Sequence, residues 1–274
     1  MNKIFLKALL FLLAGYLVIV GLLTLFQNQL IFHPSGELWE TPESLNMEWS
    51  EHRVETSDGV TLHGWMIGEP EGQPVVVFSH GNAGNISGRI EIAKTIAEQG
   101  SAVFLYDYRG YGNSEGSPSE EGIYEDGKSV TRYLRDELGI SPVQMVFYGK
   151  SLGGAVAARQ AAEFRGTGLV LDSVFTSGKD IATDIYPFIP GFLVAVDFPV
   201  DDDIRRTGAE RILIMHARDD RIIPFRHGEK LYRIAVETAG GEQVTFTELR
   251  GGHNTGFSQS KNLYREAWSE FLNK

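Results

Sequence analysis

The sequence predicts an α/β fold with a mostly parallel sheet, helices on both faces and functional loops at the carboxyl ends of the strands. The first observation behind this prediction is that short apolar runs alternate with helical stretches from about residue 60 onward. The second is that the runs end in polar or glycine-rich loops. The third is the string Gly149-Lys150-Ser151-Leu152-Gly153, which directly follows one of these runs.

In the first predicted strand, apolar and polar residues alternate. The other predicted strands are continuous apolar runs, which are typical of strands buried on both faces of a sheet. They cover residues 60–67, 74–78, 102–106, 145–148, 168–171, 211–215 and 244–249.

Two helices have recognisable signals. In the string Ser117-Pro118-Ser119-Glu120, a serine at the N-cap, proline at the first helical position and glutamate at the third predict a helix that runs to about Leu138. The last helix is expected to carry Leu263, Ala267 and Phe271 at helical spacing.

Composition limits the function classes. The chain has 274 residues and a net charge of −11, without a cluster of Lys or Arg, so a phosphate backbone would be repelled and nucleic acid is not an expected partner. Cysteine is absent, which excludes disulfides and thiolate chemistry. His-rich metal spacing such as H-E-x-x-H is absent as well, and we expect neither a metal nor a cofactor.

The N-terminus carries an uncharged apolar run from Ala8 to Phe26, long enough to cross a hydrocarbon core of about 30 Å. No small-x-small cleavage site follows, which favours an uncleaved signal anchor over a removed signal peptide. Lys3 and Lys7 precede the run, and no Lys or Arg occurs between it and Arg53. The positive-inside rule then predicts a single-pass protein with a cytoplasmic N-terminus and an extracytoplasmic catalytic domain, periplasmic in a Gram-negative cell.

This gives a predicted organisation in three parts: a membrane anchor over residues 1–30, a linker over 31–52 and one large domain over 53–274. The last part is long enough to bury a substantial core. No internal repeat is visible, and the oligomeric state is not predicted.

The string around Ser151 matches the G-x-S-x-G pattern of a nucleophile elbow, in which small residues give room to a sharp strand-to-helix turn. Gly149, Gly153 and Gly154 supply that room here. A phosphate-binding loop of the type G-x-x-x-x-G-K-S is the competing interpretation, but it requires glycine at Gln144. Since a short motif also recurs by chance, the presence of its partner residues must distinguish a nucleophile elbow from a chance match.

A serine nucleophile needs a base and an acid, which follow it in the order Ser, Asp, His. The predicted strand 211–215 leads into a loop with two adjacent carboxylates, of which we expect Asp220 to be the acid and Asp219 to cap the loop or face solvent. Asp172, at the end of another strand, is the alternative acid. His253 lies between glycines and the last helix and is the expected base.

The other six histidines fit packing or loop roles better. His80 and His216 precede their turns and are expected to hydrogen-bond loop backbone, and the rest lack comparable context: His33, His52, His63 and His227.

Acyl transfer also requires backbone N–H donors aimed at the developing oxyanion. One comes from the residue after the serine and one from the loop after an earlier strand. We therefore expect the amides of Leu152 and Asn82 to form the oxyanion hole, although the loop around Asn82 alone would equally fit an ordinary turn.

From about Val54 to its C-terminus the chain resembles the α/β-hydrolase superfamily, and in particular membrane-anchored α/β-hydrolase-domain serine hydrolases. The resemblance rests on the motifs around Ser151, Asp220 and His253 together with His80-Gly81-Asn82-Ala83-Gly84-Asn85 and Asp107-Tyr108-Arg109-Gly110-Tyr111-Gly112. It implies an eight-stranded, mostly parallel sheet, a small cap over about 175–210, the triad Ser151, Asp220 and His253, and esterase, thioesterase or lipid hydrolase activity. The resemblance implies that the loop from Asp107 to Gly112 has a structural role and takes no part in the chemistry.

The expected substrate is a small-molecule ester or thioester with an apolar acyl group, because the cap segment is rich in apolar side chains and the anchor holds the domain at a membrane. These side chains would equally serve to pack the cap onto the sheet: Tyr186, Phe188, Ile189, Phe192, Leu193, Val194, Val196 and Phe198. A peptidase or amidase would use the same triad. A non-catalytic binding domain on this fold should lack a triad member, and none is missing here.

Overall fold

The protein, described by a computed structural model over residues 3–273, is built around an eight-stranded sheet. Its strands are β2 (Trp49–Glu55), β3 (Thr61–Ile67), β4 (Val75–Ser79), β6 (Ala102–Tyr106), β7 (Met145–Lys150), β8 (Gly168–Asp172), β9 (Arg211–Ala217) and β10 (Val244–Leu249), and a separate pair is formed by β1 (His33–Pro34) and β5 (Ala83–Gly84). The helices are α1 (Lys3–Leu25), α2 (Gln27–Ile31), α3 (Ile90–Ala97), α4 (Glu120–Asp136), α5 (Gly153–Phe164), α6 (Gly178–Ile185), α7 (Val200–Arg206), α8 (Arg226–Ala239), α9 (Gly256–Gln259) and α10 (Lys261–Leu272).

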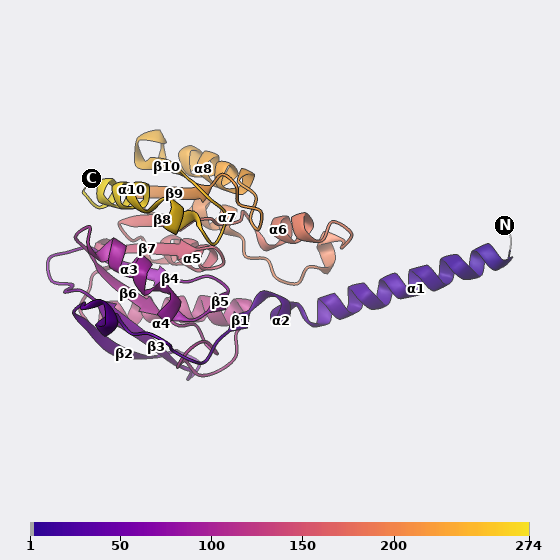
Figure 1. The fold of residues 1–274 in the computed structure, drawn as a ribbon, viewed down its shortest axis with the longest axis horizontal. Helices are drawn as coiled ribbons and strands as arrows, with labels where there is room; N and C mark the ends of the chain where they lie inside the picture. Colours follow the sequence, from indigo (N-terminus) through magenta and orange to yellow (C-terminus); the bar gives the residue numbers. More distant parts are fainter. Residues whose placement is uncertain (1–2, 274) are drawn as a thin grey trace.

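The strand order across the sheet is β10-β9-β8-β7-β4-β6-β3-β2. Only β3 runs antiparallel to its neighbours, and every other pairing in this sheet is parallel. The carboxyl ends of β4, β7, β8, β9 and β10 therefore meet at one edge (Figure 1). This confirms the predicted mostly parallel sheet, and a strand not predicted from sequence, β2, begins within the range assigned to the linker.

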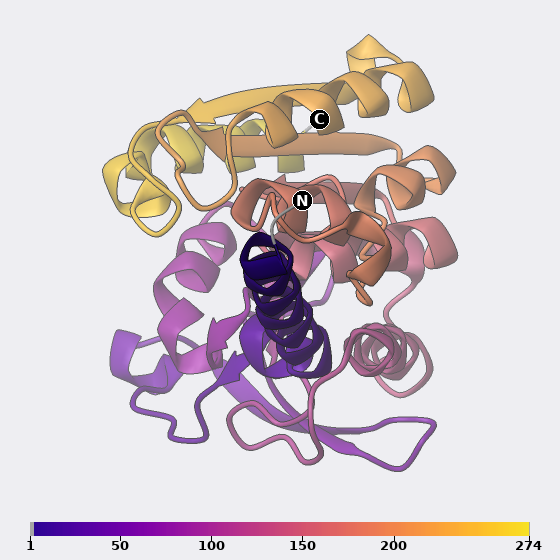
Figure 2. The same ribbon diagram turned by 90° about the vertical axis from the view of Figure 1, so that its right-hand side faces the viewer.

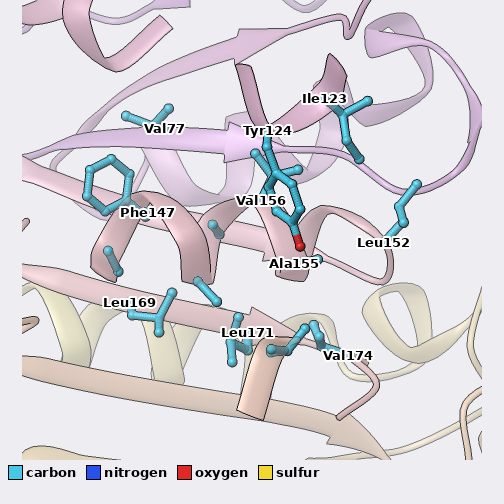
Figure 3. Packing of buried hydrophobic residues seen from close by; sticks show 14 of the residues in the cluster. Val77, Ile123, Tyr124, Phe147, Leu152, Ala155, Val156, Leu169, Leu171 and Val174 are labelled. Carbon is cyan, nitrogen blue, oxygen red and sulfur yellow. The ribbon is translucent and has the colours of Figure 1, made fainter. Parts of the chain in front are cut away.

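Hydrophobic packing occurs on both faces of the sheet because the buried strands alternate their side chains. Val75 and Val77 of β4 belong to one core with helices α4, α5 and α8, whereas Val76 and Phe78 belong to a second core with α3 and α10. Figure 3 shows the first core, where Val156 of α5 lies over the strands. The small residues at the start of α5 bring this helix close to the sheet.

One helix start differs from the prediction. The helix expected from Ser117 begins at Glu120, with Ser119 as its N-cap, accepting a hydrogen bond from the backbone N–H of Gly122 at 3.0 Å. Glu120 is thereby the first helical residue and not the third. The next helix, α8, follows a turn and begins two residues after Pro224.

The inward face of the last helix also differs from the prediction. Ala267 and Phe271 are buried as expected, but Leu263 is 37% exposed. Tyr264 and Trp268 fill the core in its place. The apolar spacing identified the helix correctly, but an aromatic residue one position later gains more from burial than a leucine.

Helix α1 has the length and apolar composition of a membrane span, and 6% of its most apolar window is buried. It projects away from the domain at the sheet edge where the carboxyl ends of the parallel strands meet (Figure 1). Seen along α1, helix α6 and the chain after it lie beside α1 at the same edge (Figure 2). The apolar helix thus starts from the end of the domain that carries the functional loops.

We predict that Gly153→Ala lowers the free energy of unfolding by about 3 kcal/mol or more, because a Cβ at this position would overlap the backbone carbonyl of Ser79 and the backbone cannot move away cheaply. The matched control is Gly191→Ala, where a Cβ meets no atom within 4 Å, and a change within about 0.5 kcal/mol is expected. Urea unfolding followed by tryptophan fluorescence measures both. Equal stability of the two variants would contradict the close approach of α5 to β4.

Candidate active site

Ser151 lies in the turn between β7 and α5, and its backbone is left-handed with φ of 54°. This conformation is costly for a residue with a side chain, and it survives only where the surroundings fix it. Here the Ser151 N–H donates to the carbonyl of Asp172 at 2.9 Å, and its own carbonyl accepts from the N–H of Gly154 at 3.0 Å. The turn presents the Ser151 hydroxyl at the carboxyl ends of the strands, facing the loop of His253.

His253 faces this hydroxyl from the loop after β10. Its Nε2 lies 3.0 Å from Oγ of Ser151. The loop is held by the N–H of Gly252, which donates to Oγ1 of Thr255 at 2.9 Å, and by the N–H of Arg250, which donates to Oγ of Ser260 at 2.7 Å. The ring is thereby fixed where it can accept the serine proton.

Asp220 completes the arrangement from the loop after β9. One carboxylate oxygen lies 2.7 Å from Nδ1 of His253, and the other accepts the N–H groups of Ile222 and Ile223 at 2.9 and 2.8 Å. Since an ionised carboxylate only accepts, Nδ1 of His253 carries the hydrogen, which leaves Nε2 as an acceptor toward Ser151.

Electrostatics keep Asp220 ionised. Burial acts to raise the pKa of its carboxyl, but the hydrogen bond and charge of His253 and the two backbone N–H donors outweigh burial, and the net effect is a lowered pKa. A negative carboxylate at this place orients the imidazole and stabilises it when it becomes positively charged.

The two competing acids lie elsewhere. Asp219 is exposed to solvent. The carboxylate of Asp172 is fully buried and accepts from Nζ of Lys150 at 2.9 Å and from Oγ of Ser173 at 2.9 Å. The structure therefore brings Asp220, and neither alternative, to His253.

The predicted oxyanion donors flank the serine. Gly81 lies so close that a Cβ there would be 3.5 Å from Cβ of Ser151, which places the loop of Asn82 beside the nucleophile. Within residues 3–273, the N–H groups of Asn82 and Leu152 donate no hydrogen bond inside the chain. Two unpaired donors next to a nucleophile are what an oxyanion hole requires.

The loop that carries Asn82 is fastened from two directions. The carbonyl of Asn82 accepts from the N–H of His33 at 2.9 Å and from the hydroxyl of Tyr111 at 2.7 Å, and its side chain donates to the carbonyl of Ile31 at 3.0 Å. The segment that follows the apolar helix is thus part of the site. Sequence reasoning missed this contribution, because β1 has only two residues and gives no periodic signal.

Two other histidines adopt the structural roles expected of them. Nδ1 of His80 lies 2.7 Å from the carbonyl of Gly81, and Nε2 of His216 lies 2.9 Å from the carbonyl of Ile223. Burial lowers the pKa of His216, so its uncharged ring donates from Nε2 to that carbonyl. Both rings brace loops that carry site residues.

Among residues 3–273, no group of three or more His, Asp or Glu side chains is placed to hold a metal ion. The geometry instead offers a nucleophile, a base within reach of its proton, an acid that fixes the base and two N–H donors. Such a set can attack an acyl carbonyl and stabilise the resulting negative charge.

Comparisons with known proteins agree with this architecture. A family profile described as alpha/beta hydrolase fold matches residues 74–207. The alpha/beta hydrolase domain-containing protein WAV2 of Arabidopsis thaliana is 32% identical over 95% of this chain and 92% of its own length. Protein bem46 of Schizosaccharomyces pombe is 34% identical over 77% of this chain and 76% of its own length. An esterase from Pyrococcus furiosus superposes with a TM-score of 0.72 at 18% identity, covering 89% of this chain and 97% of the esterase. The chain belongs to the α/β hydrolase family.

Proposed function

We propose that the protein is a serine hydrolase that cleaves carboxylic ester or thioester bonds of apolar acyl substrates. The observation that carries this proposal is the continuous hydrogen-bonded series from Asp220 through His253 to Oγ of Ser151, with distances of 2.7 and 3.0 Å. A partly buried polar series of this kind next to two free N–H donors has a direct use in acyl transfer.

The proposed reaction has two halves. In the first, Oγ of Ser151 attacks the acyl carbonyl while Nε2 of His253 takes its proton, and the same proton then passes to the leaving alcohol or thiol. The negative oxygen of the tetrahedral intermediate is bound by the N–H groups of Asn82 and Leu152, each worth roughly 3 kcal/mol. In the second half, water activated by His253 hydrolyses the acyl-enzyme and releases the acid.

An apolar acyl group is favoured by the surroundings of the site. The segment 186–196 is uncharged, and the apolar helix α1 leaves the domain at the same edge as the catalytic loops (Figure 2). The name esterase belongs to the structural neighbour from Pyrococcus furiosus, and it is consistent with this class of substrate. The proposal needs neither a metal nor a cofactor.

We further propose that α1 anchors the protein in a membrane with its N-terminus in the cytoplasm, as the lysines at positions 3 and 7 favour. When the full chain carries a C-terminal tag, we then expect protease added to spheroplasts to cleave the tag. A tag that is protected until the cells are lysed would show the opposite orientation.

The first prediction concerns ester hydrolysis by the full-length protein in detergent. We expect turnover of p-nitrophenyl esters, with the chain-length optimum reporting the size of the acyl site, and a loss of at least about 10⁴-fold in Ser151→Ala. A folded wild type that cleaves aminoacyl amides in preference to esters would identify an amidase, and no turnover of either class would point to a binding role.

The second prediction separates the two neighbouring carboxylates. Asp220→Asn leaves Nδ1 of His253 without an anionic partner and is expected to lower kcat about 10⁴-fold, whereas Asp219→Asn, at an exposed position, leaves kcat unchanged within about twofold. Steady-state kinetics of both variants check this. Equal activities of the two variants would reject Asp220 as the acid.

The same substitution has a pH-dependent effect on stability. Because the pKa of Asp220 is lower in the folded than in the unfolded chain, its ionised form stabilises the fold above the unfolded value of about 3.9. This stabilisation is lost as the pH falls through the lower, folded pKa. Urea unfolding from about pH 7 to about pH 3 should therefore show the stability difference between wild type and Asp220→Asn shrinking, and a constant difference would contradict the lowered pKa.

A further inference from the structure

The cap carries exposed apolar side chains for which the proposed catalytic reaction gives no reason. We use the name cap tip for residues 186–196, which have the sequence Tyr-Pro-Phe-Ile-Pro-Gly-Phe-Leu-Val-Ala-Val and contain no charged residue. Phe188 is 52% exposed and Phe192 is 85% exposed, whereas Val196 and, just beyond the tip, Phe198 are buried in the domain core. The apolar side chains of the cap therefore divide into a packed base and a projecting tip.

Polar contacts hold the cap in place at both ends of the tip. On the side of α6, Asp184 lies 2.7 Å from Nε2 of His227 on α8. After the tip, the N–H groups of Asp197 and Phe198 donate to the carboxylate of Glu120 at 2.7 and 2.6 Å. The exposed phenylalanines are thus presented by an anchored segment.

The cap tip also lies against the apolar helix. The hydroxyl of Tyr16 donates to the carbonyl of Phe188 at 2.9 Å. Gln27, the first residue of α2, donates from Nε2 to the carbonyl of Leu193 at 3.0 Å and accepts from the N–H of Ala195 at 2.8 Å. These contacts join the cap tip to residues 16–27, which also contain no charged residue, and the paired residues are more than 160 positions apart in the sequence.

The place of Tyr16 within α1 indicates how deep the cap tip would lie in a membrane that α1 spans. Tyr16 and Leu25 are nine residues apart, which corresponds to about 14 Å along a helix and to about one half of a hydrocarbon core of 30 Å. A loop beside this part of a spanning helix lies within one leaflet. Loop carbonyls are tolerated there only when they find donors, and Tyr16 and Gln27 supply donors to Phe188 and Leu193.

The same end of α1 leads to the nucleophile. Ile31, at the end of α2, accepts from the side chain of Asn82, and His33 donates to the carbonyl of Asn82, whose N–H is one proposed oxyanion donor. Ile31 and His33, which hold this loop, follow Leu25, the last residue of α1, by only six and eight residues. A membrane that contains α1 is adjacent to the reacting centre.

We propose that the cap tip inserts beside α1 into the leaflet next to the catalytic domain, and that the substrate is a membrane-resident acyl lipid whose acyl chain enters the site from that leaflet. The substrate route rests on the proposed serine hydrolase function, whereas the insertion of the cap tip does not. Burial of a phenylalanine side chain in an apolar phase is favourable, which favours insertion of Phe188 and Phe192 over their exposure to water.

Insertion is tested without an activity assay. Because the chain has no cysteine, Phe192→Cys and Val143→Cys each give a single site for an environment-sensitive fluorophore, and Val143 is 67% exposed in a short 3-10 helix outside the cap. In phosphatidylcholine vesicles with brominated acyl chains, we expect emission of the label at position 192 to fall about twofold or more, with no change at position 143. Equal emission of the position 192 label in brominated and unbrominated vesicles would overturn insertion.

The substrate route is tested with the full chain in phosphatidylcholine vesicles. We expect the double variant Phe188→Ser and Phe192→Ser to lose about tenfold or more in turnover of a vesicle-borne p-nitrophenyl palmitate relative to dissolved p-nitrophenyl acetate, because two apolar contacts with the leaflet are removed. Val143→Ser is the matched control and keeps the wild-type ratio of the two rates.

The outcomes separate the two proposals. An unchanged palmitate to acetate ratio in the double variant would overturn access from the leaflet. If wild type cleaves neither ester, or if Ser151→Ala cleaves acetate as fast as wild type, the serine hydrolase proposal fails and the substrate route fails with it. The quenching experiment would still decide whether the cap tip inserts.

Discussion

The left-handed turn at Ser151 is the constraint on which the rest of the site depends. The turn requires β7 to end, α5 to begin and β4 to pass close by within a few residues, and Gly149 and Gly153 have no space for a side chain. Its strain is held by hydrogen bonds to neighbouring backbone, so the hydroxyl stands at the sheet edge in one orientation. Every other site residue is useful only because that position is fixed.

The parallel sheet supplies the remaining geometry. Because β9 and β10 are neighbours and both end at the edge where β7 ends, the loops after them bring Asp220 and His253 to the serine from positions 69 and 102 residues away along the chain. The same edge receives the segment after α1, whose residues Ile31 and His33 hold the loop of Asn82. The proposed membrane anchor and the proposed oxyanion hole are thus linked through Ile31 and His33.

Much of this arrangement could be predicted from the sequence, since it depends on local signals. Continuous apolar runs identified the buried strands, and glycine on both sides of Ser151 identified the turn. The preference for Asp220 over Asp219 rests on its place three residues before Ile223, and in the structure its carboxylate accepts the N–H groups of Ile222 and Ile223. Local signals did not identify which residues of the last helix face the core. In the structure Tyr264 is buried there, and Leu263 is partly exposed.

Other features had no local signal at all. The pairing of β1 with β5 involves two residues on each side, too few for a periodic pattern. The contacts of Tyr16 and Gln27 with the cap tip join segments far apart in sequence, and the split of the cap into a buried base and an exposed tip depends on Glu120 binding the returning chain. Such long-range polar contacts become visible only in three dimensions.

The central claim is that Ser151 is a nucleophile activated by His253, and covalent labelling tests it most directly. The full-length protein is treated with an alkyl fluorophosphonate, and the adduct is located by mass spectrometry of the proteolysed chain. The account predicts one adduct per chain, on Ser151, formed rapidly in wild type and slowly in His253→Ala. A folded wild type that stays unmodified at Ser151, or that is labelled equally fast without His253, would contradict it.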